Sequence, residues 1–119
     1  MVTEKTLMKF GFIKDENNFQ LKEVFKNNSR LKTIHIDVYP ENPLVSSSAP
    51  FMLLSRTIEK NAAVSNEGNR LILMRNDDFD THFMNVLFSE IKECYRGAYV
   101  SSEFILNIQN IWYRITVLN

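Results

Sequence analysis

The stretch that decides the predicted fold is residues 31–39, LKTIHIDVY. Its apolar side chains Ile34, Ile36 and Val38 fall on alternate positions, and the positions between them carry polar or amphipathic residues. Such alternation is typical of a strand with one face on the core and the other in solvent. The prolines that follow end the strand, because proline cannot donate a hydrogen bond to the ladder.

Five other segments are predicted as strands from their alternation or from their β-branched and aromatic content. They are residues 19–25, 51–58, 70–75, 99–108 and 111–118. In the first of them Phe19 is expected on the buried side, and the polar connection 59–69 is predicted as a loop. The C-terminal part also fits a helical stripe from Phe104 to Ile115, so two strands or one helix stay open there. Its composition favours the strands.

Two helices are predicted. Thr3 caps a short first helix that stops at Gly11. Residues 79–95 form the second and longer helix, because their apolar side chains recur every three or four positions. An aspartate precedes this helix as its N-cap, and an Arg-Gly pair closes it.

Together these elements predict an α+β fold in one domain, residues 1–119. We expect a single antiparallel sheet of about five to six strands, with the short N-terminal helix and with helix 79–95 packed on one face. A chain of this length with 45% hydrophobic residues can bury one core and leaves little room for a second domain.

Composition disfavours several functional classes. Basic and acidic residues balance at 14 each, so the chain has no net attraction for phosphate backbones, and nucleic acid is a disfavoured partner. With three glycines it has neither of the common phosphate-binding loops, and we expect no cofactor. The single cysteine, Cys94, excludes an internal disulfide, and its place on an apolar stripe predicts a core thiol rather than a nucleophile.

The sequence also lacks a membrane segment. No apolar run approaches the ~18 residues that a membrane span requires. The first residues, MVTEKTLMKF, are too polar for the apolar block of a signal peptide. We therefore expect a cytoplasmic protein with no membrane partner.

The two histidines lie near carboxylates. His35 and Asp37 are two apart on the predicted strand, so they share a face, and Asp78 and His82 are four apart at the start of the predicted helix. If these segments meet, the four side chains could hold zinc, iron or manganese. His35, Asp37 and His82 are also the candidates for acid–base catalysis. Ordinary surface polarity and helix capping are the favoured explanation of these residues, so no metal or catalytic site is predicted outright.

A second candidate site is a row of arginines. Arg56, Arg75 and Arg114 each lie in a predicted strand, and adjoining strands would align them on the open face of the sheet. A guanidinium row binds carboxylates or phosphates bidentately, so a small anionic ligand is the partner that such a row would take. Pairing with Asp or Glu across strands is the simpler explanation.

A third candidate is a protein interface. Helix 79–95 carries more apolar residues than one sheet can cover, and Met84, Phe88 and Tyr95 are left over. Methionine and aromatic residues are favoured at interfaces, so these three are the candidate contacts for a protein partner or a second copy of the chain. Burial in a core with two sides is the alternative.

These observations favour a small non-catalytic binding module that acts through protein–protein contact, such as an inhibitor, an adaptor or an accessory protein of a microbe or phage. One alternative is a small metal-dependent or acid–base enzyme using His35, Asp37, Asp78 and His82. Another is a binder of a small anionic ligand through the arginine row. The missing motifs favour a chain that is not an enzyme, but the sequence leaves catalysis undecided.

Overall fold

The computed structural model of the chain describes residues 2–26, 33–39, 43, 55–59, 62–64, 69–74, 82–99 and 102–118. Two α-helices and nine strands lie in these segments. The helices are α1 (Glu4–Lys9) and α2 (Phe19–Lys26), and single 3₁₀ turns form at η1 (Glu16–Asn18) and η2 (Phe88–Glu90). The strands are β1 (Phe12–Lys14), β2 (Thr33–Tyr39), β3 (Ser55–Glu59), β4 (Ala62–Val64), β5 (Arg70–Met74), β6 (His82–Leu87), β7 (Ile91–Gly97), β8 (Glu103–Ile108) and β9 (Ile111–Leu118).

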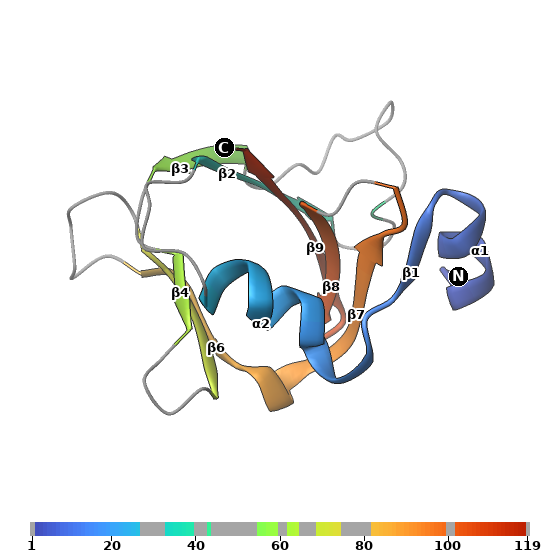
Figure 1. Cartoon of the computed structure of the whole chain (residues 1–119), viewed down its shortest axis with the longest axis horizontal. Coiled ribbons are helices and arrows are strands. Elements are labelled where there is room, and N and C mark those ends of the chain that lie inside the picture. The colour runs from blue at the N-terminus through green and yellow to red at the C-terminus, as the bar shows by residue number, and fades with distance from the viewer. Residues whose placement is uncertain are drawn as a thin grey trace.

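The described strands form two antiparallel sheets. The larger sheet has six strands in the order β1-β7-β8-β9-β2-β3, and the smaller has three in the order β4-β5-β6. Figure 1 shows α2 on the inner side of the curved larger sheet, with β4 on the other side of the helix. It shows α1 at the far end of the larger sheet, next to β1.

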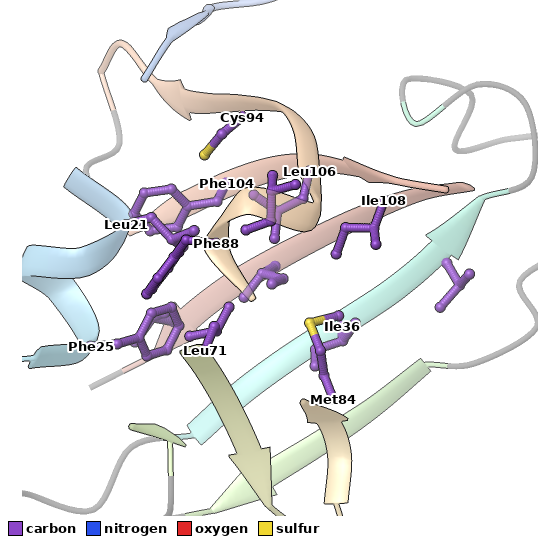
Figure 2. Packing of buried hydrophobic residues seen from close by; sticks show 14 residues of the cluster. Leu21, Phe25, Ile36, Leu71, Met84, Phe88, Cys94, Phe104, Leu106 and Ile108 are labelled. Carbon is purple, nitrogen blue, oxygen red and sulfur yellow. The ribbon is translucent and has the colours of Figure 1, made fainter. Parts of the chain in front are cut away.

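The main core, which we call the inner core, lies between α2 and the two sheets. Figure 2 shows side chains from both sheets, α2 and η2 converging there. Leu21 and Phe25 of α2 are almost fully buried, and the Phe25 ring lies 6.5 Å from the ring of Phe104 in β8. The buried members are Leu21, Phe25, Ile36, Val38, Leu71, Met84, Phe88, Ile91, Cys94, Phe104, Leu106, Ile108, Ile115 and Val117.

A second, smaller core covers part of the opposite face of the larger sheet. It consists of Leu7, Phe12, Tyr39, Tyr95, Ile105 and Trp112, and we call it the outer core. Leu7 is the buried residue of α1, and it packs against the aromatic side chains that the sheet presents on this face. The sheet is therefore apolar on both sides, at least where α1 lies over it.

The predicted helix over residues 79–95 is wrong. Its described part forms β6 and β7, which belong to different sheets and are joined by η2. Met84, Phe88, Ile91 and Cys94 are buried in the inner core, and their spacing of four, three and three imitates a helix. The 3₁₀ turn and a register shift between Ile91 and Glu93 produce this spacing, because each interrupts the period of two that strands otherwise keep.

The predicted single sheet and the predicted strand over 19–25 are also wrong. The strands divide into two sheets, and residues 19–26 form helix α2. Leu21 and Phe25 are four apart and share the buried face of that helix, whereas Phe19 is 65% exposed. The start of the helix is fixed by Asp15, whose carboxylate accepts hydrogen bonds from the backbone N–H groups of Gln20 and Leu21, both at 2.9 Å.

Several other predictions are confirmed. Thr3 caps α1, since its hydroxyl oxygen accepts a hydrogen bond from the Thr6 backbone N–H, and Gly11 follows the helix with φ of +87°. Residues 33–39 form β2, and β8 with β9 settle the C-terminal region as two strands rather than one helix. By contrast, part of the predicted loop 59–69 is a short strand, β4. None of the helices in the described segments is long and apolar enough to cross a lipid bilayer.

Candidate functional site

A pocket of about 130 Å³ opens on the outer face of the larger sheet, next to the end of α1. We call it the Phe10–Tyr99 pocket. Its lining comes from the turn after α1, from β1, β7, β8 and β9 and from the bend after β7, and thus from distant parts of the sequence. The lining residues are Phe10, Gly11, Phe12, Gly97, Tyr99, Glu103 and Arg114.

Strand register creates the pocket. Phe12 of β1 pairs with Gly97 of β7, and the β7–β8 register places Gly97 beside Glu103. Residues paired across neighbouring strands present their side chains on the same face. Because Gly97 has no side chain, a gap is left in the outer-face layer between the Phe12 ring and the Glu103 carboxylate.

Arg114 of β9 reaches into this gap. Its Nε donates a hydrogen bond to Glu103 Oε1 at 2.9 Å, and its Nη2 donates to the same oxygen. The guanidinium carbon lies 5.4 Å from the centroid of the Phe12 ring, in cation–π range. The guanidinium is therefore held from two sides and forms one charged wall of the pocket.

The rim of the pocket is aromatic and exposed. Phe10 follows α1 and is 63% exposed, and Tyr99 follows β7 and is 93% exposed. The two chain segments are joined by a hydrogen bond of 2.7 Å from the Ala98 N–H to the Gly11 carbonyl oxygen. Gly11 adopts φ of +87° there, a conformation that favours glycine. Two large exposed rings thus flank the backbone contact between the turn after α1 and the end of β7.

The face beside the pocket contains Asp37. It pairs with Arg114 across β2 and β9, so the two predicted sites that contained these residues meet at one register position. The neighbouring Tyr39 belongs to the outer core. Burial, with a smaller effect from the Asp37 carboxylate, raises the pKa of the Tyr39 hydroxyl, and the Arg114 cation opposes this shift. The phenol is therefore uncharged at neutral pH.

The predicted metal and catalytic residues are only partly described. His35 lies in β2 and His82 in β6, so they belong to different sheets; only their backbone is described, and Asp78 lies outside the described residues. No group of three His, Cys, Asp or Glu side chains within the described part of the chain could hold a metal ion. The four-residue site remains an untested prediction.

The arginine row needs strands that adjoin. Arg56 lies in β3, opposite Ile36, and Arg114 lies in β9, opposite Asp37. Strand β2 separates β3 from β9, and Arg75 lies outside the described residues. Arg114 is the member of the row that lines the pocket.

The residues predicted as an interface are buried within the chain. Met84 and Phe88 belong to the inner core and Tyr95 to the outer core. The apolar surplus that suggested a partner there came from assuming a helix, and two cores now account for all three side chains. The Tyr95 hydroxyl donates a hydrogen bond to Glu93 Oε1 at 2.9 Å.

Cys94 is a core thiol, as expected. Burial raises its pKa strongly, and the carboxylate of Asp15, whose Oδ2 lies 3.6 Å from the sulfur, raises it further. A nucleophilic cysteine needs the opposite shift, toward the thiolate. The environment of Cys94 therefore favours a structural role in the core over a role as a nucleophile.

Sequence reasoning missed Phe10, Tyr99 and Glu103. Their proximity depends on the pairing of β1, β7, β8 and β9, which no single segment encodes. One local signal existed. In a chain with three glycines, Phe10 directly precedes Gly11, and Tyr99 follows Gly97 by two positions.

Comparison of the chain with protein families, with curated proteins and with solved structures finds no match.

Proposed function

We propose that the chain is a small non-catalytic binding module, which docks a partner protein at the Phe10–Tyr99 pocket. The observation that carries this proposal is the pair of exposed rings at the rim, beside a fixed guanidinium–carboxylate pair. Tyrosine, phenylalanine and arginine are enriched at protein interfaces, and tyrosine and arginine dominate their binding energy. Rings that cost free energy in water are retained where a partner covers them.

The size of the pocket supports a protein partner over a free small molecule. Sites that enclose cofactors or drug-sized ligands span roughly 300–1,000 Å³. The Phe10–Tyr99 pocket measures about 130 Å³, which suits one anchoring side chain or a short piece of chain. The rest of the partner would rest on the surrounding surface of the sheet and α1.

A small anionic ligand is the weaker candidate. Arg114 could attract an anion, since its side chain is 28% exposed. The Glu103 carboxylate already neutralises that charge, however, and would repel a phosphate placed in the same pocket. The charges of the pocket therefore favour an uncharged occupant.

Site-specific photo-crosslinking tests the proposal. The photoreactive residue p-benzoylphenylalanine is introduced in place of Tyr99 in cells that make the chain. We expect an adduct of one defined mass, whose yield falls when Phe10→Ala is added.

The matched control places the same photoreactive residue at Phe19, which is also exposed, at 65% against 93% for Tyr99, but does not line the pocket. Equal yields of adduct from both positions would mean that the crosslinking is non-specific, and the proposal would then be wrong. No adduct from position 99 would count against it as well.

A further inference from the structure

We infer that the segment of the partner that docks at the Phe10–Tyr99 pocket is acidic. This inference rests on the proposed function and names the chemistry of the partner. One uncharged, apolar side chain of the segment fills the pocket, and two Asp or Glu side chains beside it interact with Lys9 and Lys5. The segment thus follows the exposed side of α1, which we call the α1 ridge and which consists of Lys5, Met8 and Lys9.

Helix α1 has different surroundings on its two sides. Leu7 is fully buried against the sheet in the outer core. Burial, a hydrogen bond to Glu93 and, with a smaller effect, the Glu4 carboxylate raise the pKa of the Tyr95 hydroxyl in the same core. Lys5 and Lys9 are four apart, so they share the side of the helix opposite Leu7, and both are exposed. The acid of α1 therefore acts on the outer core, whereas its two lysines face solvent.

The α1 ridge ends at the pocket. Lys9 is the last residue of α1 and directly precedes Phe10 of the rim. A β-carbon on Gly11 would lie 3.8 Å from Tyr99 Cδ2, so the Tyr99 ring lies next to the turn that follows α1. Because neighbouring Cα atoms are close, the Lys9 ammonium lies within roughly 10 Å of Phe10, which is about one Debye length in 0.1 M salt. A charge on a docked segment would therefore feel this lysine.

The charge beside the pocket is positive in the described part of the chain. Glu103 is the one acidic residue of the pocket lining, and Arg114 neutralises it. Lys5 and Lys9 have no ion-pair partner among the described residues. Met8, which is 56% exposed, adds apolar surface to the ridge. An uncharged pocket beside two cations is the complement of an apolar anchor beside two acids.

The spacing of the two lysines fits an extended segment. A helix rises 1.5 Å per residue, so Lys5 and Lys9 are separated by about 6 Å along the axis of α1. Alternate side chains of a strand lie on one side and are separated by about 6.6 Å. Two acids at alternate positions would therefore match the two lysines. Single-stranded nucleic acid also combines negative charge with rings that stack, but a chain of zero net charge has no general attraction for it.

The test uses a phage-displayed library of random twelve-residue peptides, selected on the immobilised chain. We expect the selected peptides to share an apolar residue with two Asp or Glu residues at alternate positions beside it. The tightest peptide is synthesised, and its affinity is measured by fluorescence polarisation in 0.1 M salt. Lys9→Glu should weaken binding by about tenfold or more, because repulsion between like charges replaces an attraction.

The matched control is Lys92→Glu, which makes the same change in net charge at an exposed lysine that does not line the pocket. It should change the affinity by less than about twofold, because salt screens distant charges. A peptide whose two acids are replaced by lysines should bind Lys9→Glu more tightly than it binds wild type. Thermal unfolding of each variant verifies that it is folded.

The outcomes separate this inference from the proposed function. A peptide that loses affinity in Tyr99→Ala but binds Lys9→Glu as tightly as wild type would overturn the acidic segment and leave the docking site standing. Peptides that bind Tyr99→Ala as well as wild type would contradict both. Failure to select any peptide, or displacement of the selected peptide by a micromolar single-stranded DNA oligonucleotide, would overturn the inference of an acidic peptide segment.

Discussion

At the scale of single residues, Asp15 connects the start of α2 to strand β7. Its side chain is buried, its carboxylate accepts two backbone N–H groups of α2, and Cys94 Sγ lies 3.6 Å from Oδ2. Its own N–H donates to the Cys94 carbonyl oxygen at 2.9 Å. Asp15 therefore joins the start of α2 to strand β7, and through it the inner core to the larger sheet.

Replacing Asp15 should destabilise the fold strongly. We expect Asp15→Ala to lower the free energy of unfolding by about 2–3 kcal/mol, because a helix cap is lost and buried N–H groups are left unpaired. Asp15→Asn should cost less, since it keeps one acceptor oxygen. Urea denaturation measures both variants.

The control is Glu16→Ala at the neighbouring, exposed position, which we expect to change the free energy of unfolding by less than about 0.5 kcal/mol. Equal losses at both positions would show that the cap does not contribute as described.

Cys94 should make stability depend on pH. Its ordinary pKa is 9.0 and folding raises it, so the native state keeps its proton at pH values where the unfolded state has lost it. The stabilisation is complete below the unfolded pKa and is lost as pH rises above it, by at most about 1.4 kcal/mol per pH unit. Between about pH 9 and 10.5, urea denaturation should show a steeper loss of stability for wild type than for Cys94→Ala.

The tyrosines with raised pKa values, Tyr39 and Tyr95, are present in both proteins, and Cys94 is the smallest of the causes that raise the pKa of Tyr95, so their effects nearly cancel in this comparison. Parallel pH profiles for wild type and Cys94→Ala would contradict the account of the buried thiol.

At the scale of elements, the β8–β9 hairpin is the simplest to explain and to modify. Its two turn residues, Gln109 and Asn110, both have positive φ, at 54° and 66°, which is the type I′ turn that fits the twist of paired strands. The side-chain oxygen of Asn107 accepts a hydrogen bond of 3.1 Å from the Asn110 N–H. Glutamine is a poor choice for its position, since a left-handed conformation suits asparagine or glycine.

The variant Gln109→Asn should therefore be more stable than wild type by about 0.5–1 kcal/mol. Thermal unfolding should show the gain as a higher midpoint. The same substitution in a helix, Gln20→Asn in α2, serves as the control and should give no gain. A loss of stability in Gln109→Asn would mean that the turn is not of this type.

Elements whose apolar residues recur at one constant spacing, or whose composition is typical of strands, could be predicted from the sequence. Residues 33–39 alternate over their whole length, and the C-terminal strands are rich in β-branched and aromatic residues. Residues 82–97 could not be predicted in this way, because η2 and a register shift break their period into steps of three and four. Both faces of β7 are also buried, with Cys94 in one core and Tyr95 in the other, so polarity does not alternate there.

At the scale of the whole molecule, two sheets enclose α2, and α1 closes part of the outer face of the larger sheet. This arrangement brings residue 10 next to residue 99, and residue 103 next to residue 114. The sequence indicated that Arg114 lies in a strand, but the residues it contacts depend on the order of the strands. They also depend on register, because a shift of one residue would move every side chain of a strand to the other face of the sheet. The candidate site is therefore a property of topology rather than of a motif.

The central claim is that the Phe10–Tyr99 pocket binds a partner, and that the side chains used for binding are not needed for the stability of the fold. The most direct measurement is the affinity of a peptide or protein identified with wild type for Tyr99→Ala and for Phe19→Ala, alongside the unfolding free energy of each. We predict that Tyr99→Ala weakens binding by about tenfold or more while its stability stays within about 0.5 kcal/mol of wild type, and that Phe19→Ala changes neither. Equal affinity of Tyr99→Ala and wild type, with both folded, would contradict the claim.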